Sequence, residues 1–296
     1  MRLTARVPAT SANLGPGFDC FGLALDLCNE VTVDTEAQAG VSWEGEGADE
    51  LPTDGTDMVT RAMRHVEGLS AQTRPHPLPR LHLHGLNRIP LARGLGSSAA
   101  AAVAGIALGY ALLDLEDEYH RPETTFRVAS ELEGHPDNAA AAVFGGFTVV
   151  AGEDVERLVP HPGVHPVLLV PDRVRLSTQD ARAVLPETVP REVAVFNIGH
   201  AALTLTRLLR DPDHLRLAMR DRIHQDARLA LVPDVREVFD RLQAGNVPVC
   251  VSGSGPALLA FERERYPVPD PGEGWRVLRV PVRATGVEVF EPRTSP

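Results

Sequence analysis

The sequence predicts an α+β fold, and three observations carry that prediction. Apolar and polar residues alternate in some segments, as in strands, whereas apolar residues recur at helical spacing in others. The two kinds of segment do not follow each other in a regular order, which argues against a doubly wound parallel sheet. The length of 296 residues allows one large domain or two, and we expect a boundary near residue 155.

In the first half of the chain, strands are expected where residues alternate in polarity or are rich in β-branched types. These strand segments are 2–7, 29–35, 81–84 and 147–151. Helices are expected where apolar residues share one helical face or where alanine dominates. These helical segments are 58–69, 99–113, 124–133 and 139–143. We expect Ser97 or Ser98 to cap the second helix and Thr124 or Thr125 to cap the third, which Gly134 stops.

The second half of the chain is expected to contain more helix. Strands are indicated by the apolar runs at 164–170 and 247–251, and a further apolar segment follows at 257–261. Helical spacing of apolar residues marks the segments 180–185, 193–210, 215–230 and 235–243. A charged, proline-rich linker over 262–275 precedes two short strands that complete the chain.

The charge composition argues against several kinds of partner. The net charge is −11, from 29 basic and 40 acidic residues, which disfavours binding to nucleic acid or to an anionic membrane surface. Every basic residue is arginine, so chemistry that needs a lysine, such as a Schiff base or a P-loop lysine, is excluded.

The cysteines and the apolar runs set the expected compartment. Cys20, Cys28 and Cys250 are odd in number and lack C-x-x-C spacing, so they predict neither a disulfide framework nor a zinc site. The first residues show no cleavable leader, and no run approaches the roughly 18 apolar residues of a membrane span. We therefore expect a soluble, cytoplasmic protein.

The segment 90–101 is the most informative part of the sequence. Gly94 and Gly96 allow a tight turn and a close approach to a ligand, because glycine has no Cβ. They lead into an alanine-rich helix, whose first N–H groups are unpaired and whose dipole is positive at that end. Such a turn is suited to binding phosphate. The alternative is an ordinary glycine turn before a buried helix.

Two further glycine-rich segments occur at wide spacing. Near the N-terminus, Asn13 and Asp19 flank a turn at 15–17, where their amide and carboxylate are suited to binding a polar substrate. The alternative there is local capping of the turn by the two side chains. The third segment, 251–257, reads Val-Ser-Gly-Ser-Gly-Pro-Ala; taken alone, it is typical of a tight connection between strands.

Together, the three segments resemble the three motifs of the GHMP kinase family. Four segments resemble the homoserine kinases of that family more closely: 8–19, 90–98, 131–138 and 178–182. The resemblance covers nearly the whole chain. It implies a two-domain GHMP kinase fold, with an N-terminal nucleotide-binding domain (1–155) like domain 2 of ribosomal protein S5. The C-terminal domain (156–296) would be ferredoxin-like, with nucleotide and substrate meeting in the cleft between the domains.

The resemblance implies that ATP and Mg²⁺ are bound by the central glycine loop and its surroundings. The implied phosphate-binding residues are Pro90, Leu91, Ala92, Arg93, Gly94, Leu95, Gly96, Ser97, Ser98, Ala99 and Ala100. Backbone N–H groups of this loop would hold the phosphates. The metal ligands would be Ser98 and Glu131, although Glu133 on the same helix is an alternative to Glu131.

The resemblance also implies a site for homoserine. The implied substrate-binding residues are Asn13, Asp19, His135, Asn138, Arg182 and Arg228. An arginine is suited to binding the α-carboxylate, an aspartate the α-ammonium, and an asparagine or histidine could orient the hydroxyl.

The predicted catalytic residues are Asn138, Thr178 and Arg182. Relatives such as mevalonate kinase have a catalytic aspartate where this chain has Asn138, which cannot take a proton at neutral pH. We therefore hypothesise direct attack of the substrate hydroxyl on the γ-phosphoryl group, with Asp137 as the alternative base.

The expected function is ATP- and Mg²⁺-dependent phosphorylation of the side-chain hydroxyl of L-homoserine, a step of threonine synthesis. The resemblance also implies a homodimer. Two alternatives stay open at this point. One is a GHMP kinase acting on another small alcohol, such as mevalonate or a sugar. The other is a metabolite sensor without catalysis.

Overall fold

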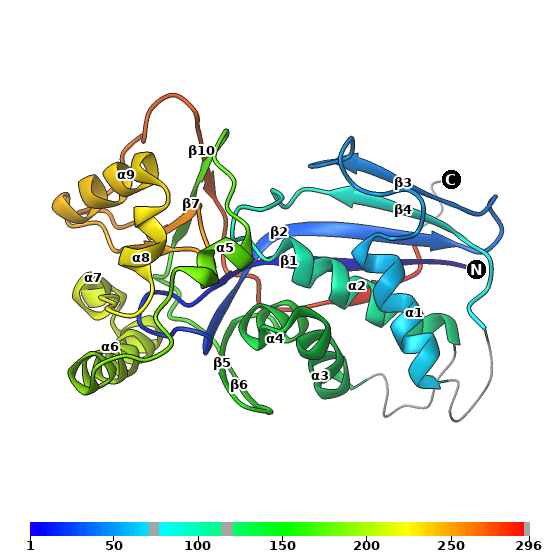
Figure 1. Ribbon diagram of the computed structural model, residues 1–296, viewed down its shortest axis with the longest axis horizontal. Helices are drawn as coiled ribbons and strands as arrows, with labels where there is room; N and C mark the ends of the chain where they lie inside the picture. Colours follow the sequence, from blue (N-terminus) through cyan, green and yellow to red (C-terminus); the bar gives the residue numbers. More distant parts are fainter. Residues whose placement is uncertain (71–76, 114–120, 293–296) are drawn as a thin grey trace.

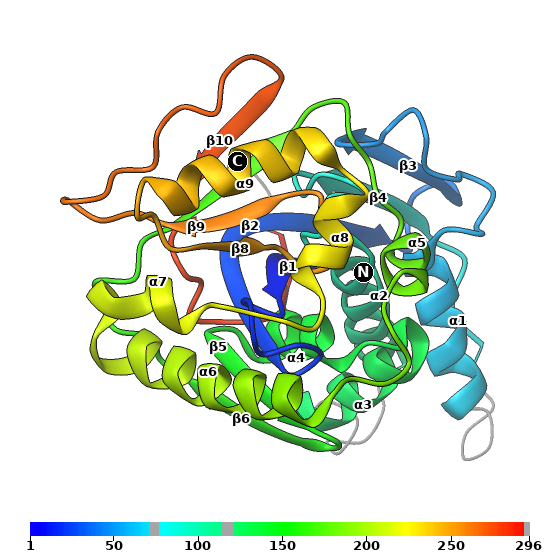
Figure 2. The ribbon, with the colours of Figure 1, turned by 60° about the vertical axis from the view of Figure 1, so that its left-hand side comes forward.

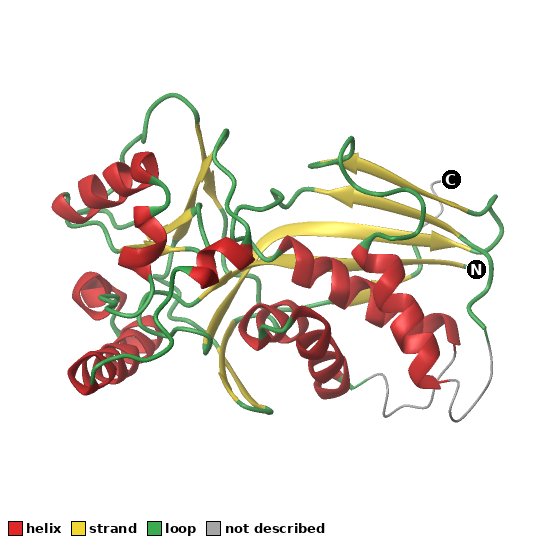
Figure 3. Cartoon of the chain, in the orientation of Figure 1, coloured by secondary structure: helices red, strands yellow, loops and turns green. Residues whose placement is uncertain are grey.

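Two β-sheets, each packed against helices, make up the fold of the computed structural model (Figure 1). The structure describes residues 1–70, 77–113 and 121–292. Helices and strands are mixed along the chain (Figure 3), which confirms the predicted α+β class. No helix in these ranges has the length and apolar character needed to cross a membrane.

The first sheet has the strand order β11-β1-β2-β4-β3, and β5 and β6 extend it from β2. Its strands are β1 (Arg2–Ala12), β2 (Phe21–Asp34), β3 (Gly40–Gly45), β4 (His82–Asn87), β5 (Phe147–Ala151), β6 (Asp154–Leu158) and β11 (Glu288–Phe290). All pairs are antiparallel except β3 with β4. The last strand of the chain therefore lies beside the first, with Thr4 opposite Phe290.

Four helices cover one face of this sheet (Figure 1). They are α1 (Met58–Ser70), α2 (Ser97–Leu113), α3 (Pro122–Glu133) and α4 (Pro136–Phe144). Most of α2 is buried, and its small residues let neighbouring elements come close. At Gly105, a Cβ would collide with the carbonyl oxygen of Val59 in α1. The alanine-rich composition of α2 is thus required by its central position.

The second sheet has the order β10-β7-β9-β8. Its strands are β7 (Pro166–Pro171), β8 (Val249–Val251), β9 (Leu258–Phe261) and β10 (Trp275–Arg279). The helices of this half are α5 (Thr178–Ala183), α6 (Arg191–Arg210), η1 (Pro212–His214), α7 (Leu215–Ala218), α8 (Gln225–Ala230) and α9 (Pro233–Ala244). Figure 2 shows α8 and α9 packed over this sheet, where Phe239 and Leu242 share a core with Val249.

Several predicted elements need correction. Neither β3 nor β6 was predicted. Strands β1 and β2 are longer than predicted, and both extend well into the glycine-rich segment between them. The single helix predicted over 215–230 is wrong, because α7 and α8 are separated by a loop. In that loop, the Asp221 carboxylate accepts hydrogen bonds from the backbone N–H groups of Ile223, His224 and Gln225, at 2.8–3.0 Å. These bonds replace those of a continuous helix.

The predicted helix caps are also wrong. Ser97 and Ser98 lie inside the first turn of α2 rather than before it. Helix α3 begins at Pro122, before either threonine, since proline is favoured in the first turn of a helix. Its end is as predicted, with Gly134 in the left-handed conformation at φ 71°.

The predicted boundary near residue 155 falls in β6, the last strand of the first sheet before the chain enters the second. Since β11 returns to the first sheet, that sheet combines strands from both ends of the chain. The division into two domains stays a prediction.

Candidate active site

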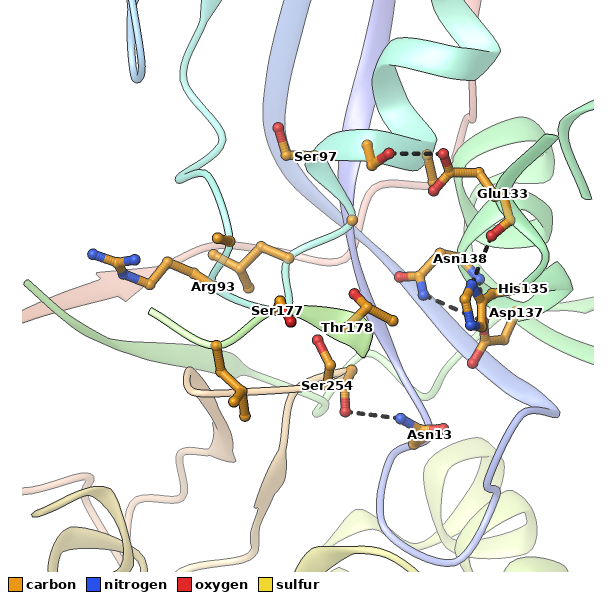
Figure 4. Close-up of a pocket in the computed structure, with 18 of the residues that line it drawn as sticks. Asn13, Arg93, Ser97, Glu133, His135, Asp137, Asn138, Ser177, Thr178 and Ser254 are labelled. Carbon is orange, nitrogen blue, oxygen red and sulfur yellow. Dashed lines mark hydrogen bonds between the residues drawn. The ribbon is translucent and has the colours of Figure 1, made fainter. Parts of the chain in front are cut away.

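A cleft of about 300 Å³ lies where elements of the two sheets meet (Figure 4). It is lined by the β1–β2 turn, the glycine loop with the start of α2, and the junction of α3 and α4. From the second half of the chain, the start of α5, helix α8 and the β8–β9 turn complete it. All three glycine-rich segments found in the sequence therefore lie around one cavity.

The glycine loop has a backbone shape that only glycine adopts freely. Gly94 and Gly96 have φ angles of 72° and 68°, in the left-handed region. A Cβ on Gly94 would collide with the carbonyl oxygen of Ser252, and one on Gly96 with the hydroxyl of Thr10. The loop is therefore pressed against β1 and the β8–β9 turn, and each glycine is needed for both conformation and space.

Hydrogen bonds brace the loop through its carbonyl groups. The Ser252 hydroxyl donates to the Gly94 carbonyl at 2.8 Å, and the Thr10 N–H donates to the Leu95 carbonyl at 3.1 Å. The N–H groups of residues 94–96 have no hydrogen-bond partner within the described ranges. The first N–H groups of α2 follow directly, and they lack partners within the helix. The loop thus offers the cleft a row of free donors at the positive end of a helix dipole.

The Arg93 side chain anchors the loop rather than lining the cleft's centre. It is 5% exposed; its Nε donates to the Pro171 carbonyl at 2.9 Å and its Nη2 to the Asp172 carbonyl at 2.7 Å. Figure 4 shows the guanidinium pointing away from the other labelled residues. Any binding of phosphate at this position is therefore left to the backbone.

The predicted metal ligands are separated by the structure. The Ser98 hydroxyl donates to Glu133 Oε1 at 2.7 Å at the rim of the cleft. Burial raises the pKa of Glu133. Glu131 is exposed and lines a different hollow, beside Arg127. Side chains two positions apart on a helix, such as those of Glu131 and Glu133, point about 200° away from each other. Only one of these glutamates can therefore face the cleft. Glu133, the alternative left open by the sequence, is the glutamate that lies in the cleft beside Ser98, and the identity of the metal ligand stays a prediction.

The predicted substrate residues near the N-terminus form one connected group. Asn13 and Asp19 both have left-handed backbones, at φ 71° and 55°. Asn13 Nδ2 donates to the Gly253 carbonyl at 2.9 Å, and Asn13 Oδ1 accepts the Asp19 N–H at 3.0 Å. Asp19 in turn forms an ion pair with Arg182, at 2.8 Å. The local capping considered in the sequence does occur, and it holds the Asp19 carboxylate in the cleft.

Arg228 is a second cation of the cleft, and it is deeply buried at 3% exposure. Its Nη1 donates to the Gly253 carbonyl at 2.8 Å, and its Cζ lies 5.4 Å from the centre of the Phe18 ring. Burial lowers the pKa of Arg228 to about 10, so the side chain is still charged at neutral pH. Among the described residues no carboxylate pairs directly with Arg228, and a buried arginine of this kind is suited to binding a ligand anion.

The junction of α3 and α4 contributes a row of polar side chains. Asn138 Oδ1 accepts the Thr10 hydroxyl at 2.7 Å, and Asp137 Oδ1 accepts the Asn138 N–H at 2.8 Å. Asp137 is 2% exposed; burial, followed by the negative charge of Asp19, raises its pKa to about 6. His135 Nδ1 donates to the Glu133 carbonyl at 2.8 Å, and burial lowers the pKa of His135.

The cleft also contains residues that the sequence analysis did not select. Thr178, which the sequence analysis selected, lines the cleft at the first position of α5. Ser177, which it did not select, also lines the cleft and caps α5, because its hydroxyl accepts the Asp180 backbone N–H. Ser254 lines the cleft from the β8–β9 turn, inside the third glycine-rich segment. The Ser-Gly-Ser-Gly-Pro pattern was the available signal for this serine, whereas nothing in the sequence indicated the packing role of Thr10.

Comparisons with known proteins identify the family. Residues 57–146 match the family model described as the GHMP kinases N terminal domain. A homoserine kinase of Clavibacter michiganensis subsp. michiganensis is 43% identical over 300 residues, which cover 99% of this chain and 88% of that protein. The chain belongs to the homoserine kinases of the GHMP kinase family.

Other members of the GHMP kinase family agree with this assignment. A homoserine kinase of Cutibacterium acnes is 45% identical over 262 residues, covering 86% of this chain and 87% of that one. The crystal structure of a homoserine kinase from Cytophaga hutchinsonii superposes with a TM-score of 0.81 at 27% identity, over 98% of this chain and 97% of that one. The resemblance found in the sequence and the GHMP kinase fold it implied are confirmed. As a member of this kinase family, the chain is an enzyme that uses ATP.

Proposed function

We propose that the chain phosphorylates the side-chain hydroxyl of L-homoserine with ATP and Mg²⁺, a step of threonine synthesis. The observation that carries the proposal is the meeting of two kinds of group in one cleft. Free backbone N–H groups of the glycine loop face a carboxylate, Asp19, and two guanidinium groups, Arg182 and Arg228. The first set is suited to binding phosphates, and the second is suited to binding an amino acid that has both charges.

The charge of each group in the cleft determines which part of the two substrates it binds. Residues 94–96 and the first turn of α2 hold the phosphate oxygens through backbone donors. Arg182 and Arg228 bind the α-carboxylate, and Asp19 binds the α-ammonium. Asp19 and Arg182 are paired with each other without substrate, so a zwitterion can replace both partners at once. A substrate with only one charge leaves Asp19 or Arg182 unpaired, which disfavours it, and a neutral sugar gives neither group an ionic partner.

Ser98 and Glu133 hold the metal ion in this proposal. Their oxygens, 2.7 Å apart, are the hard ligands that Mg²⁺ prefers. Burial raises the pKa of Glu133 because it disfavours the ionised carboxylate, and a bound cation would compensate that charge. A Mg²⁺ ion held by these two side chains would supply positive charge beside the phosphates.

The substrate hydroxyl, oriented by Asn138 and Thr178, attacks the γ-phosphoryl group directly in this proposal. As the new O–P bond forms, the bond from the γ-phosphorus to the bridging oxygen breaks, ADP leaves, and the hydroxyl proton passes to an oxygen of the transferred phosphoryl group. Asn138 has its Oδ1 occupied by Thr10 and cannot accept a proton. Phosphoryl transfer through a loose transition state depends mainly on positioning and charge stabilisation, so a general base is not required.

The test is a substrate panel with the purified protein. ADP release from MgATP is measured with L-homoserine, mevalonate, a sugar and no added alcohol, and the product is identified by ³¹P NMR. We expect turnover with homoserine far above that with the other alcohols, and formation of O-phosphohomoserine. Equal turnover with mevalonate would support the alternative substrate class, and binding of homoserine without any ADP release would support a sensor.

The homodimer implied by the resemblance stays a prediction. Light scattering during size-exclusion chromatography tests it, since the monomer has a mass of 31.9 kDa.

A further inference from the structure

A fully buried histidine, His224, contacts both Arg228 and the β1–β2 turn. It lies at 0% exposure just before α8, in the loop that follows α7. Its Nε2 is 2.8 Å from the Gly15 carbonyl oxygen, and its Nδ1 is 3.1 Å from Arg228 Nη1. The Phe18 ring stacks on it, with ring centres 5.2 Å apart. His224 thus contacts Arg228 and the turn that connects Asn13 to Asp19.

The two partners fix the state of the imidazole ring. A carbonyl oxygen only accepts, so Nε2 carries the proton that is donated to Gly15. A guanidinium nitrogen only donates, so Nδ1 must be unprotonated and accept from Arg228. His224 is therefore the neutral Nε2–H tautomer. Burial and the nearby Arg228 charge lower its pKa and favour the same state, against the opposing effect of Asp221.

The surroundings of His224 hold the ring in place. Asp221 Oδ2 accepts a hydrogen bond from the backbone N–H of His224 at 2.9 Å, and Asp221 Oδ1 accepts one from Asn197 Nδ2 at 2.7 Å. The position of the ring is therefore set by α6 and by the loop between α7 and α8. Arg228 has its Nε and Nη1 directed to protein acceptors, the Ala181 and Gly253 carbonyls and His224 Nδ1. Its Nη2 has no hydrogen-bond partner among the described residues, so it is the nitrogen available to a ligand.

We propose that His224 is a positioning residue for the amino-acid substrate. Its ring holds the Arg228 guanidinium through Nδ1 and the Gly15 turn through Nε2, so that the guanidinium and the Asp19 carboxylate keep the separation that a zwitterion requires. The inference rests on the proposed function, because it assigns Arg228 to the substrate carboxylate. His224 does not touch the substrate, and its effect is on binding rather than on the chemical step.

Two conservative substitutions separate the two contacts of the ring. In His224→Asn, the amide oxygen can occupy the place of Nδ1 and accept from Arg228, while the contact with Gly15 is lost. In His224→Gln, the amide nitrogen can occupy the place of Nε2 and donate to Gly15, while the acceptor for Arg228 is lost. A hydrogen bond to a charged group is strong enough to change binding by about tenfold.

The experiment measures KM for homoserine, KM for ATP and kcat in both variants, with the wild-type protein assayed beside them. We expect His224→Gln to raise KM for homoserine about tenfold and His224→Asn to raise it about threefold or less. KM for ATP should stay within about twofold in both variants. In an Arg228→Met background, His224→Gln should have no further effect on KM for homoserine.

A matched control separates positioning from general destabilisation. Val235→Ala removes buried side-chain volume from α9 in the second core and should lower the melting temperature without touching the cleft. The proposal is overturned if this control raises KM for homoserine as much as His224→Gln does. It is also overturned if the two His224 variants have the same KM for homoserine, or if KM for ATP rises in parallel.

A measurement on the wild-type protein covers the case in which a variant does not fold. In ¹⁵N-histidine-labelled protein at pH 7, we expect His224 to show a protonated Nε2 and an unprotonated Nδ1. Its Nδ1 resonance should shift when homoserine is added. A protonated Nδ1, or no shift at saturating homoserine, overturns the inference. Failure of the proposed function looks different, because the wild-type protein would then show no homoserine-dependent release of ADP.

Discussion

Replacing Asp137 by asparagine tests the mechanism and the energetics of the cleft together. The carboxylate is 2% exposed, and its pKa is raised from 3.8 to about 6, first by burial and then by the charge of Asp19. Two pH units correspond to about 3 kcal/mol by which the ionised, buried form is disfavoured at neutral pH. In Asp137→Asn, the Oδ1 atom can still accept both hydrogen bonds from Asn138. The variant is therefore expected to be more stable than the wild-type protein by up to about 3 kcal/mol at pH 7.5.

The stability difference should depend on pH in a defined direction. The folded-state pKa of Asp137 lies above its ordinary value of 3.8, so the wild-type protein loses stability as pH rises through about 6. The advantage of the variant should be full above pH 7, shrink as pH falls below about 6, and vanish well below pH 3.8, where the carboxyl is protonated in both states. For a chain of 296 residues, 3 kcal/mol corresponds to a rise in Tm of about 5 °C. Differential scanning fluorimetry from pH 5 to 8 measures it, with the exposed Asp240→Asn as a control that should leave Tm unchanged.

The same variant decides between direct attack and general-base catalysis. Without a base role for Asp137, kcat at saturating ATP and homoserine should fall less than about tenfold, whereas loss of a general base costs about 10²–10⁴-fold. A fall in that larger range, in a protein that is folded and no less stable, would assign Asp137 as the base. A lower Tm at pH 7.5 would show that the burial argument is wrong.

Three further substitutions probe the remaining parts of the cleft. Gly94→Ala should raise KM for ATP about tenfold or more, because a Cβ there collides with the backbone of the β8–β9 turn; Gly199→Ala, at an exposed helical position with no atom near the added carbon, should leave it unchanged. Glu133→Gln should raise the Mg²⁺ concentration for half-maximal activity about tenfold, whereas Glu131→Gln should not change it; the reverse result would restore the original ligand prediction. Arg182→Met should raise KM for homoserine about tenfold or more with little effect on KM for ATP, and a parallel rise in both would contradict its assignment to the carboxylate.

The sequence by itself determined which segments line the cleft. Three glycine-rich segments were identified because left-handed turns and close backbone approaches require glycine, and the structure places all three around one cleft. The α+β class and most helices followed from periodicity, which depends only on local geometry. Arg182 and Arg228 were found through the resemblance, since a surface arginine and a ligand-binding arginine look alike in a sequence.

Other features were decided only by tertiary packing. The return of β11 to the first sheet depends on pairing between residues nearly 290 positions apart, such as Thr4 and Phe290, which no local pattern encodes. Glu133 rather than Glu131 faces the cleft because the orientation of α3 is set by its neighbours. The neutral state of His224 follows from two partners, Gly15 and Arg228, that approach it from opposite sides. Local sequence thus specified turns and periodicities, whereas burial, charge state and side-chain partners arose where distant segments met.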